Sequence, residues 1–171
     1  HMGPAGEYDP PATVDYNLWA GPAPMQIPVR RPHFHYDWHW FWDYDNGELG
    51  NNSVHVVDTM RLILGLQGLG RRVLSYGARQ FDDAGETPNT QVTIHDFGDL
   101  TVVQEVRNLK SAAPERGGAL LIEGTEGYMV GSLGSNTVFD LEGKVVEKLT
   151  GESEDHVANF IKAVRSRKVS D

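Results

Sequence analysis

The sequence contains no cysteine, which excludes disulfide bridges, a thiolate nucleophile and zinc–sulfur centres. No apolar run approaches the ~20 residues that a membrane-spanning helix needs. There is no G-x-G-x-x-G motif, so the sequence does not predict a dinucleotide-binding fold within this chain. Positive charge is scarce, and the net charge of −9 argues against binding to nucleic acid or to an anionic membrane. We therefore expect neither of these as a partner.

The length and composition are those of one globular domain: 171 residues, of which 39% are hydrophobic and 23% charged. His1-Met2 looks like the remnant of a purification tag. Residues 3–32 hold seven of the nine prolines, interrupted only by DYNLWAG. Because proline fixes φ and lacks a backbone donor, this range predicts an extended arm and not a helix. We take residues 33–171 as the folded domain.

Aromatic residues alternate with histidine and aspartate in HFHYDWHWFWDYD, residues 33–45. A period of two predicts an extended strand with one aromatic face and one face of imidazoles and carboxylates. His33, His35, His39 and Asp37 could then hold a metal ion. The aromatic face could instead stack on sugar rings or fill a core. The pattern alone leaves these three interpretations open.

The next segment predicts a helix over about 52–64, with Asn51, Asn52 and Ser53 as candidate N-caps and Gly65 as a stop. Asn51 and His55 are four residues apart, so they lie on one helix face and can reach one substrate. The positive end of the helix disfavours imidazolium, which makes His55 a candidate neutral base. The alternative is an N-cap asparagine and a partly buried histidine.

The remainder of the chain predicts short strands and a final helix. Strands are expected at residues 72–81, 90–97, 100–109, 118–124, 127–133, 136–141 and 144–150, and a helix capped by Ser153 follows up to Lys168. Short turns between strands favour antiparallel pairing. The expected fold class is therefore α+β, an open, mainly antiparallel sheet with helices packed on one face.

Several long stretches resemble the C-terminal domain of the glucose–fructose oxidoreductase / inositol dehydrogenase / MocA family (Gfo/Idh/MocA), in a branch common in bacteria. They are DYNLWAGPAPM, FHYDWHWFWDYDNGELGNNSVHVVD, GETPNTQVTIHDFGDLTVVQEVRNL, GTEGYMVGSLGSNTVFD and HVANFIKAVRSRK. The family signature is three glycines, three variable residues, Asp, three variable residues and His. Laid on this chain it runs from Asp45 to His55, with Asn51 at the Asp position.

The resemblance implies that His55 is the acid/base and that Asn51 contacts the substrate, although an amide cannot share a proton with His55. It implies a pocket wall made by the aromatic segment, for which the expected substrate-binding residues are Tyr36, Trp38, His39, Trp40 and Asn52. The expected substrate is a sugar or cyclitol. The resemblance implies no metal.

The resemblance also implies a parent enzyme that uses NAD or NADP, bound by an N-terminal Rossmann domain. We expect neither that domain nor the family's C-terminal extension in this chain, which should bind no cofactor and be inactive alone. A dimer or tetramer should form through the sheet face. The alternative is a carbohydrate-binding or assembly module that has lost its redox function. In that case Asn51, which replaces the family's Asp, would mark the loss. The parent's location, cytoplasmic or periplasmic, stays open.

Overall fold

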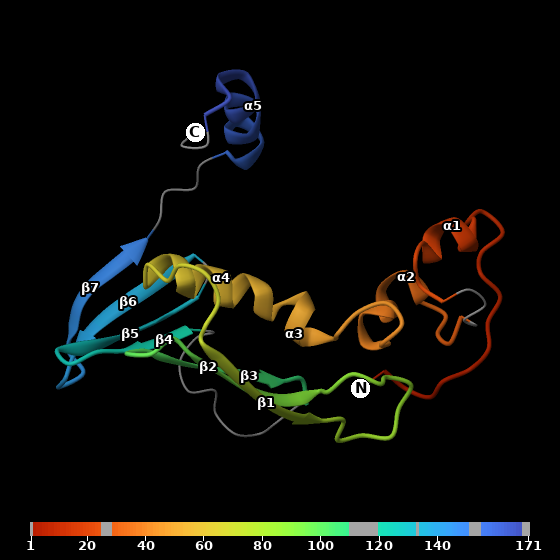
Figure 1. Cartoon of the computed structure of the whole chain (residues 1–171), viewed down its shortest axis with the longest axis horizontal. Helices are drawn as coiled ribbons and strands as arrows, with labels where there is room; N and C mark the ends of the chain where they lie inside the picture. The colour runs from red at the N-terminus through yellow and green to blue at the C-terminus, as the bar shows by residue number, and fades with distance from the viewer. Residues whose placement is uncertain (1, 25–28, 110–119, 133, 151–154, 169–171) are drawn as a thin grey trace. The chain divides into compact units, whose positions relative to one another are not determined.

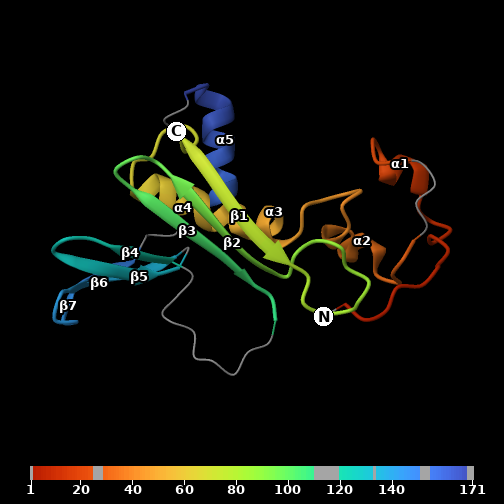
Figure 2. The same cartoon turned by 60° about the horizontal axis from the view of Figure 1, so that its bottom comes forward.

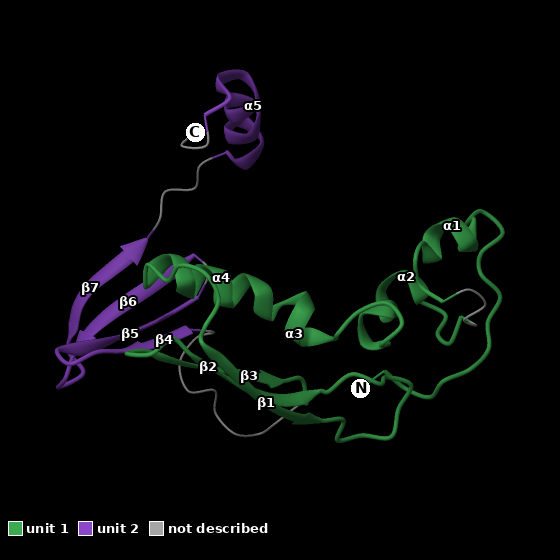
Figure 3. Cartoon of the chain, in the orientation of Figure 1, with its two compact units in different colours: residues 1–114 green, residues 115–171 purple. Residues whose placement is uncertain are grey.

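The computed structural model describes residues 2–24, 29–109, 120–132, 134–150 and 155–168. The chain divides into two compact units, residues 1–114 and residues 115–171 (Figure 3). The boundary falls inside the range 33–171, for which the sequence predicts one folded domain. No helix in the described part of the chain is long and apolar enough to span a membrane.

Unit 1 begins with short helices and ends in a three-stranded sheet (Figure 1). Its helices are α1 (Tyr16–Ala20), α2 (Phe34–Asp37), the 3₁₀ helix η1 (Trp38–Trp40), α3 (Glu48–Asn51) and α4 (Ser53–Ile63). Helix α4 lies within one residue of the prediction at each end. It closes with a Schellman motif, because the N–H of Leu66 bonds the carbonyl of Arg61 across Gly65, whose φ is +63°.

Strands β1 (Arg72–Ala78), β2 (Thr90–Asp96) and β3 (Thr101–Arg107) form an antiparallel sheet in this order. The register aligns Leu74, Ile94 and Val103 in one row across the sheet. Helix α4 lies along the opposite face (Figure 2), where Val102 and Val106 are buried. Val103 lies on the other face and is 58% exposed, and no described helix of unit 1 covers that face.

Unit 2 is an antiparallel meander of β4 (Leu120–Glu123), β5 (Gly127–Gly131), β6 (Ser135–Asp140) and β7 (Val145–Thr150), followed by α5 (His156–Ser166). Tyr128 stacks on Phe139 across β5 and β6 with ring centroids 4.9 Å apart. The carboxylate of Asp155 caps α5 by accepting from the backbone N–H groups of Val157 and Ala158. The predicted cap Ser153 lies outside the described residues.

The α+β class and the antiparallel pairing are confirmed, and each expected strand is present, although 118–119 and 133 lie outside the described residues. The strands form two hydrogen-bonded sheets, where one was expected. The prediction that the arm contains no helix is wrong at α1. Asp15 caps this helix by accepting from the N–H of Leu18 at 3.0 Å, and Trp19 packs edge-on against Phe34 at 4.9 Å. These contacts stabilise five helical residues that composition alone did not indicate.

Candidate functional site

The segment of alternating aromatic residues is helical, so the predicted strand over residues 33–45 is wrong. The carbonyl of His33 accepts from the N–H groups of Tyr36 and Asp37, which starts α2, and η1 follows directly. Along such turns each residue rotates by about 100°, so even-numbered side chains cannot share one face. Phe34 is buried, whereas Tyr36 is 55% exposed. Ring contacts between residues three and four apart stabilise helical turns over the strand that the residue types favour.

Four of the expected substrate-binding residues meet around one imidazole. The ring of His39 stacks on Trp38 at 3.8 Å and lies 5.1 Å from Tyr36 and 5.5 Å from Trp40. Tyr36 also contacts Trp40 at 5.6 Å. All except the exposed Tyr36 are half-buried. We call this group the aromatic cluster: Tyr36, Trp38, His39 and Trp40.

Helix α3, which ends at Asn51, lies against η1, which carries three residues of the aromatic cluster. Asn51 is the last residue of α3 and is half-buried, and His55 is exposed in the first turn of α4. Asn52 between them keeps a helical conformation (φ −102°, ψ −34°), so the turn continues from Asn51 to His55. The side chains of Asn51 and His55 make no hydrogen bond with the residues that the structure describes.

Asn52 has a different role from the one that its capping position suggests. Its side-chain amide donates to the Glu48 carboxylate, one turn earlier, and its oxygen caps no backbone N–H of α4. The side chain stays exposed. This bond ties α3 to the start of α4 and presents the Asn52 amide at the surface near Asn51.

The loop 79–89 holds η1 and α3 in place, and sequence reasoning did not identify it. The backbone N–H groups of Glu86 and Thr87 donate to the carbonyl of Trp40 at 2.8 and 3.3 Å. Thr87 is fully buried and packs on Gly47, the residue before α3. Arg79 donates from Nη1 to the carbonyl of Thr87 at 2.8 Å. One loop thus fixes both segments that carry the candidate site.

A buried ion pair stiffens this loop from within. Nε and Nη2 of Arg79 both lie 2.7 Å from Oδ1 of Asp83, whose side chain is 0% exposed, against 12% for Arg79. Asp83 also accepts from the N–H groups of Met2 and Gly85. Burial by itself would raise the pKa of Asp83, but these hydrogen bonds and the Arg79 charge together lower it below its ordinary value. Asp83 is therefore a buried carboxylate that the fold keeps ionised.

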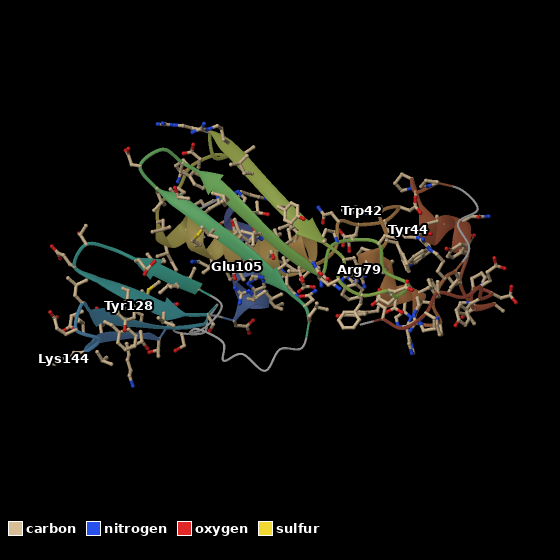
Figure 4. All side chains as sticks on the ribbon, turned by 90° about the horizontal axis from the view of Figure 1, so that it is seen from below. Trp42, Tyr44, Arg79, Glu105, Tyr128 and Lys144 are labelled. Atoms are coloured by element: carbon tan, nitrogen blue, oxygen red, sulfur yellow. The ribbon has the colours of Figure 1, made fainter. Side chains whose placement is uncertain are left out.

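The proline-rich arm is fastened to the same region through Arg30. Its guanidinium lies 3.9 Å above the ring of Phe41 and pairs with Glu86 and, at 3.5 Å, with Asp43. Glu86 also accepts from the N–H of Trp42 at 3.0 Å. Trp42, Tyr44 and Arg79 are labelled in this part of unit 1 in Figure 4. The backbone that carries the exposed Trp42 indole is thus fixed by Glu86, which pairs with Arg30, and by the contact of Arg30 with Phe41.

A pair of phenols locks α1 onto the segment after η1. The hydroxyls of Tyr16 and Tyr44 are 3.0 Å apart, and Trp19 lies 5.2 Å from the Tyr44 ring. Burial first, and then the hydrogen bond to Tyr16, raise the pKa of Tyr44 well above its ordinary value. Tyr44 therefore remains a neutral hydroxyl with a structural role.

Gly47→Ala should destabilise unit 1 more than Gly21→Ala does. Both glycines have positive φ (+77° and +55°), so each alanine incurs about 1–3 kcal/mol of backbone strain. At Gly47 a Cβ would also lie 2.8 Å from Cβ of Thr87, whereas no atom of the described residues lies within 4 Å at Gly21. That overlap adds roughly 1–3 kcal/mol. Urea unfolding followed by tryptophan fluorescence measures the free energy of unfolding of unit 1, since all four tryptophans lie in unit 1. Equal losses for the two variants would contradict the packing of Thr87 on Gly47.

The metal-site interpretation finds no support in the geometry. No three His, Asp or Glu side chains of the described residues gather closely enough to hold a metal ion. His33, His35, His39 and Asp37 therefore do not form a ligand set. The ring nitrogen Nδ1 of His39 instead contacts the carbonyl of Tyr36, and Asp37 pairs with Arg31 at 3.3 Å.

Comparison with known proteins identifies the domain. Residues 6–170 match a family described as "Oxidoreductase family, C-terminal alpha/beta domain", in the Gfo/Idh/MocA group. A search of curated proteins finds no match. The match covers both units and includes the aromatic cluster, the loop 79–89 and the helices that carry Asn51 and His55. This chain therefore belongs to the Gfo/Idh/MocA oxidoreductase family, as its C-terminal alpha/beta domain.

Proposed function

We propose that the parent protein oxidises or reduces a hydroxyl of a sugar or cyclitol with NAD or NADP, and that this chain binds the substrate and transfers the proton. The observation that carries the proposal is the exposed imidazole of His55, one helical turn after Asn51, on a helix whose preceding turn lies against η1. An imidazole that bonds no described residue, on the chain segment that follows an aromatic cluster, suits a polyhydroxylated ring.

His55 acts in this scheme as general base. A neutral imidazole would accept the proton of the reacting hydroxyl while the hydride on the same carbon passes to the nicotinamide held elsewhere in the parent, and it would return the proton in the reverse direction. Asn51 can accept from one hydroxyl and donate to another, because its amide carries both functions. It therefore orients the substrate but cannot store the proton that the family's aspartate could share.

The aromatic cluster contributes the apolar side of recognition. Sugars and cyclitols have faces of C–H groups that pack on aromatic rings, while their hydroxyls remain available for hydrogen bonds. The exposed face of Tyr36 and the half-buried Trp40, 5.6 Å apart, offer such a surface. The neighbouring Trp42, also exposed, is an additional candidate that the sequence analysis did not select.

The glycines at 124, 127, 131 and 134 begin, end or connect strands and do not open a helix, as a pyrophosphate site requires. These four glycines therefore do not form a phosphate-binding loop for NAD or NADP. We assign the cofactor to a separate domain of the parent and expect no dehydrogenase activity from this chain alone.

The direct test of the function is an assay of the full-length parent with NAD and with NADP over a panel of sugars and cyclitols. Reduction of the nicotinamide with at least one substrate supports an oxidoreductase. Binding of the same compounds without turnover with either cofactor would support the alternative, a carbohydrate-binding module. Asn51→Asp discriminates further: in an enzyme that can use the family's relay, turnover should hold or rise.

We also propose that two copies associate through the uncovered sheet face of unit 1. Its apolar row contains Leu74, Ile94 and Val103, and an exposed apolar patch of this kind usually marks an interface. Glu105 lies on the same face, labelled in Figure 4. A two-fold pairing of like faces is the commonest arrangement. The buried area should exceed ~1,000 Å².

Light scattering at micromolar concentration should give a dimer or tetramer mass, and Val103→Asp should shift it to the monomer. Leu18→Asp, an equally drastic change at an exposed site in α1, should leave the mass unaltered. A mass near the 19.0 kDa of one chain at every concentration would contradict the proposed association.

A further inference from the structure

The chemistry of His39 is fixed by its position in the aromatic cluster. Its Nδ1 lies 2.5 Å from the backbone carbonyl of Tyr36. A carbonyl oxygen only accepts hydrogen bonds, so Nδ1 must carry a hydrogen. In the neutral ring the other nitrogen, Nε2, is then a bare acceptor, and the tautomer is set by this single bond.

The acceptor nitrogen is available. Nε2 of His39 has no hydrogen-bond partner among the described residues, and it is not among their buried unpartnered atoms. Rotation of the His39 ring about χ2 is restricted, because Trp38 stacks on one face at 3.8 Å and Nδ1 bonds the carbonyl of Tyr36. Tyr36 and Trp40 stand tilted at its sides, at 57° and 53° to the imidazole plane.

We infer that His39 Nε2 is a fixed hydrogen-bond acceptor that recognises a ring hydroxyl of the substrate while Tyr36 or Trp40 packs against its C–H face. This inference rests on the proposed function and narrows it, because it makes His39 a specificity-determining residue, distinct from the base His55. The ligand class is a six-membered polyol ring, such as a hexose or a cyclitol. A metal ion is not the expected ligand, because no three His, Asp or Glu side chains of the described residues gather closely enough to hold one.

The inference is tested on this chain with ¹⁵N-labelled histidine and long-range ¹H–¹⁵N spectra, which distinguish the two tautomers. His39 should show a protonated Nδ1 and a bare Nε2. Addition of D-glucose, D-galactose or myo-inositol should move the Nε2 signal in at least one case. The exposed neighbour His35, whose ring nitrogens bond no described residue, provides an internal control that should not move.

Two substitutions separate the acceptor from the ring. His39→Phe keeps an aromatic side chain without an acceptor and should weaken binding of the responding polyol ~10-fold or more, the worth of one hydrogen bond whose partner is lost. His39→Gln keeps an acceptor at similar reach and should retain most of the affinity. His35→Phe should bind as the unaltered chain does.

A protonated Nε2, an Nε2 signal that no member of the panel moves, or unchanged affinity in His39→Phe would overturn the inference. Failure of the proposed redox function would give a different set of results. A parent without turnover, whose His39 signal still responds to the polyol, would retain the binding site and refute only the dehydrogenase.

Discussion

Replacing Asp83 with asparagine should lower the free energy of unfolding of unit 1 by roughly 3–5 kcal/mol, the usual cost of breaking a buried ion pair from one side. The substitution leaves the Arg79 guanidinium, which is only 12% exposed, without its anion. It also weakens the acceptor for the N–H groups of Met2 and Gly85. Urea unfolding followed by tryptophan fluorescence measures the loss. Asp82→Asn, at the exposed neighbouring position, should change stability by less than about 0.5 kcal/mol.

The same carboxylate should make unit 1 sensitive to acid. The pKa of Asp83 is lower in the folded than in the unfolded protein, so its stabilisation is complete above the unfolded value of about 3.9 and is lost as pH falls through the lower folded value. Below about pH 4 the difference in stability between the unaltered chain and Asp83→Asn should therefore shrink. The pKa of Asp96 is also lowered, by the N–H of Gly98 and by Arg72. Because Asp96 is present in both the unaltered chain and Asp83→Asn, its contribution cancels in the difference between their stabilities. A difference that stays constant with pH would show that Asp83 is not ionised in this pair.

His55→Ala should lower the turnover of the full-length parent by roughly 10²–10⁴, the usual contribution of a positioned general base. Substrate affinity should change much less, because the aromatic cluster and Asn51 remain. Initial rates with saturating cofactor over a range of substrate concentrations separate these two quantities. The loss should appear mainly in kcat.

The matched control for this variant is His156→Ala. His156 is likewise an exposed histidine in the first turn of an eleven-residue helix, α5, in unit 2. It should leave kcat and KM unchanged. If His55→Ala turns over at the unaltered rate, or if both variants lose activity equally, His55 is not the base.

The regular elements could be predicted because their signals are local. Strands β2 and β3 follow from β-branched residues on both sides of the turn at Gly98, whose φ is +96°. Helix α4 follows from its apolar spacing and from the stop at Gly65. The same helix placed Asn51 and His55 within one turn, and the structure keeps that relation even though a separate short helix, α3, precedes Asn52.

The aromatic segment could not be predicted because its conformation depends on distant partners as well as on its local ring contacts. Its period of two matches a strand, but the carbonyl of Trp40 is taken by Glu86 and Thr87, over forty residues later in the chain. The side chain of Thr87 is buried against Gly47, and the local sequence around these two residues does not predict this contact. Arg79 and Asp83 are four residues apart and so resemble an ordinary surface pair, and only burial reveals their role.

The central claim is that the aromatic cluster, Asn51 and His55 bind one polyol. Amide ¹H–¹⁵N shifts of this chain, recorded while D-glucose, D-galactose or myo-inositol is added, test it most directly. The account predicts that the perturbed amides gather in three places, namely η1, α3 and the first turn of α4, and that unit 2 stays unperturbed. Perturbations confined to unit 2, or none with any of the three compounds, would contradict it.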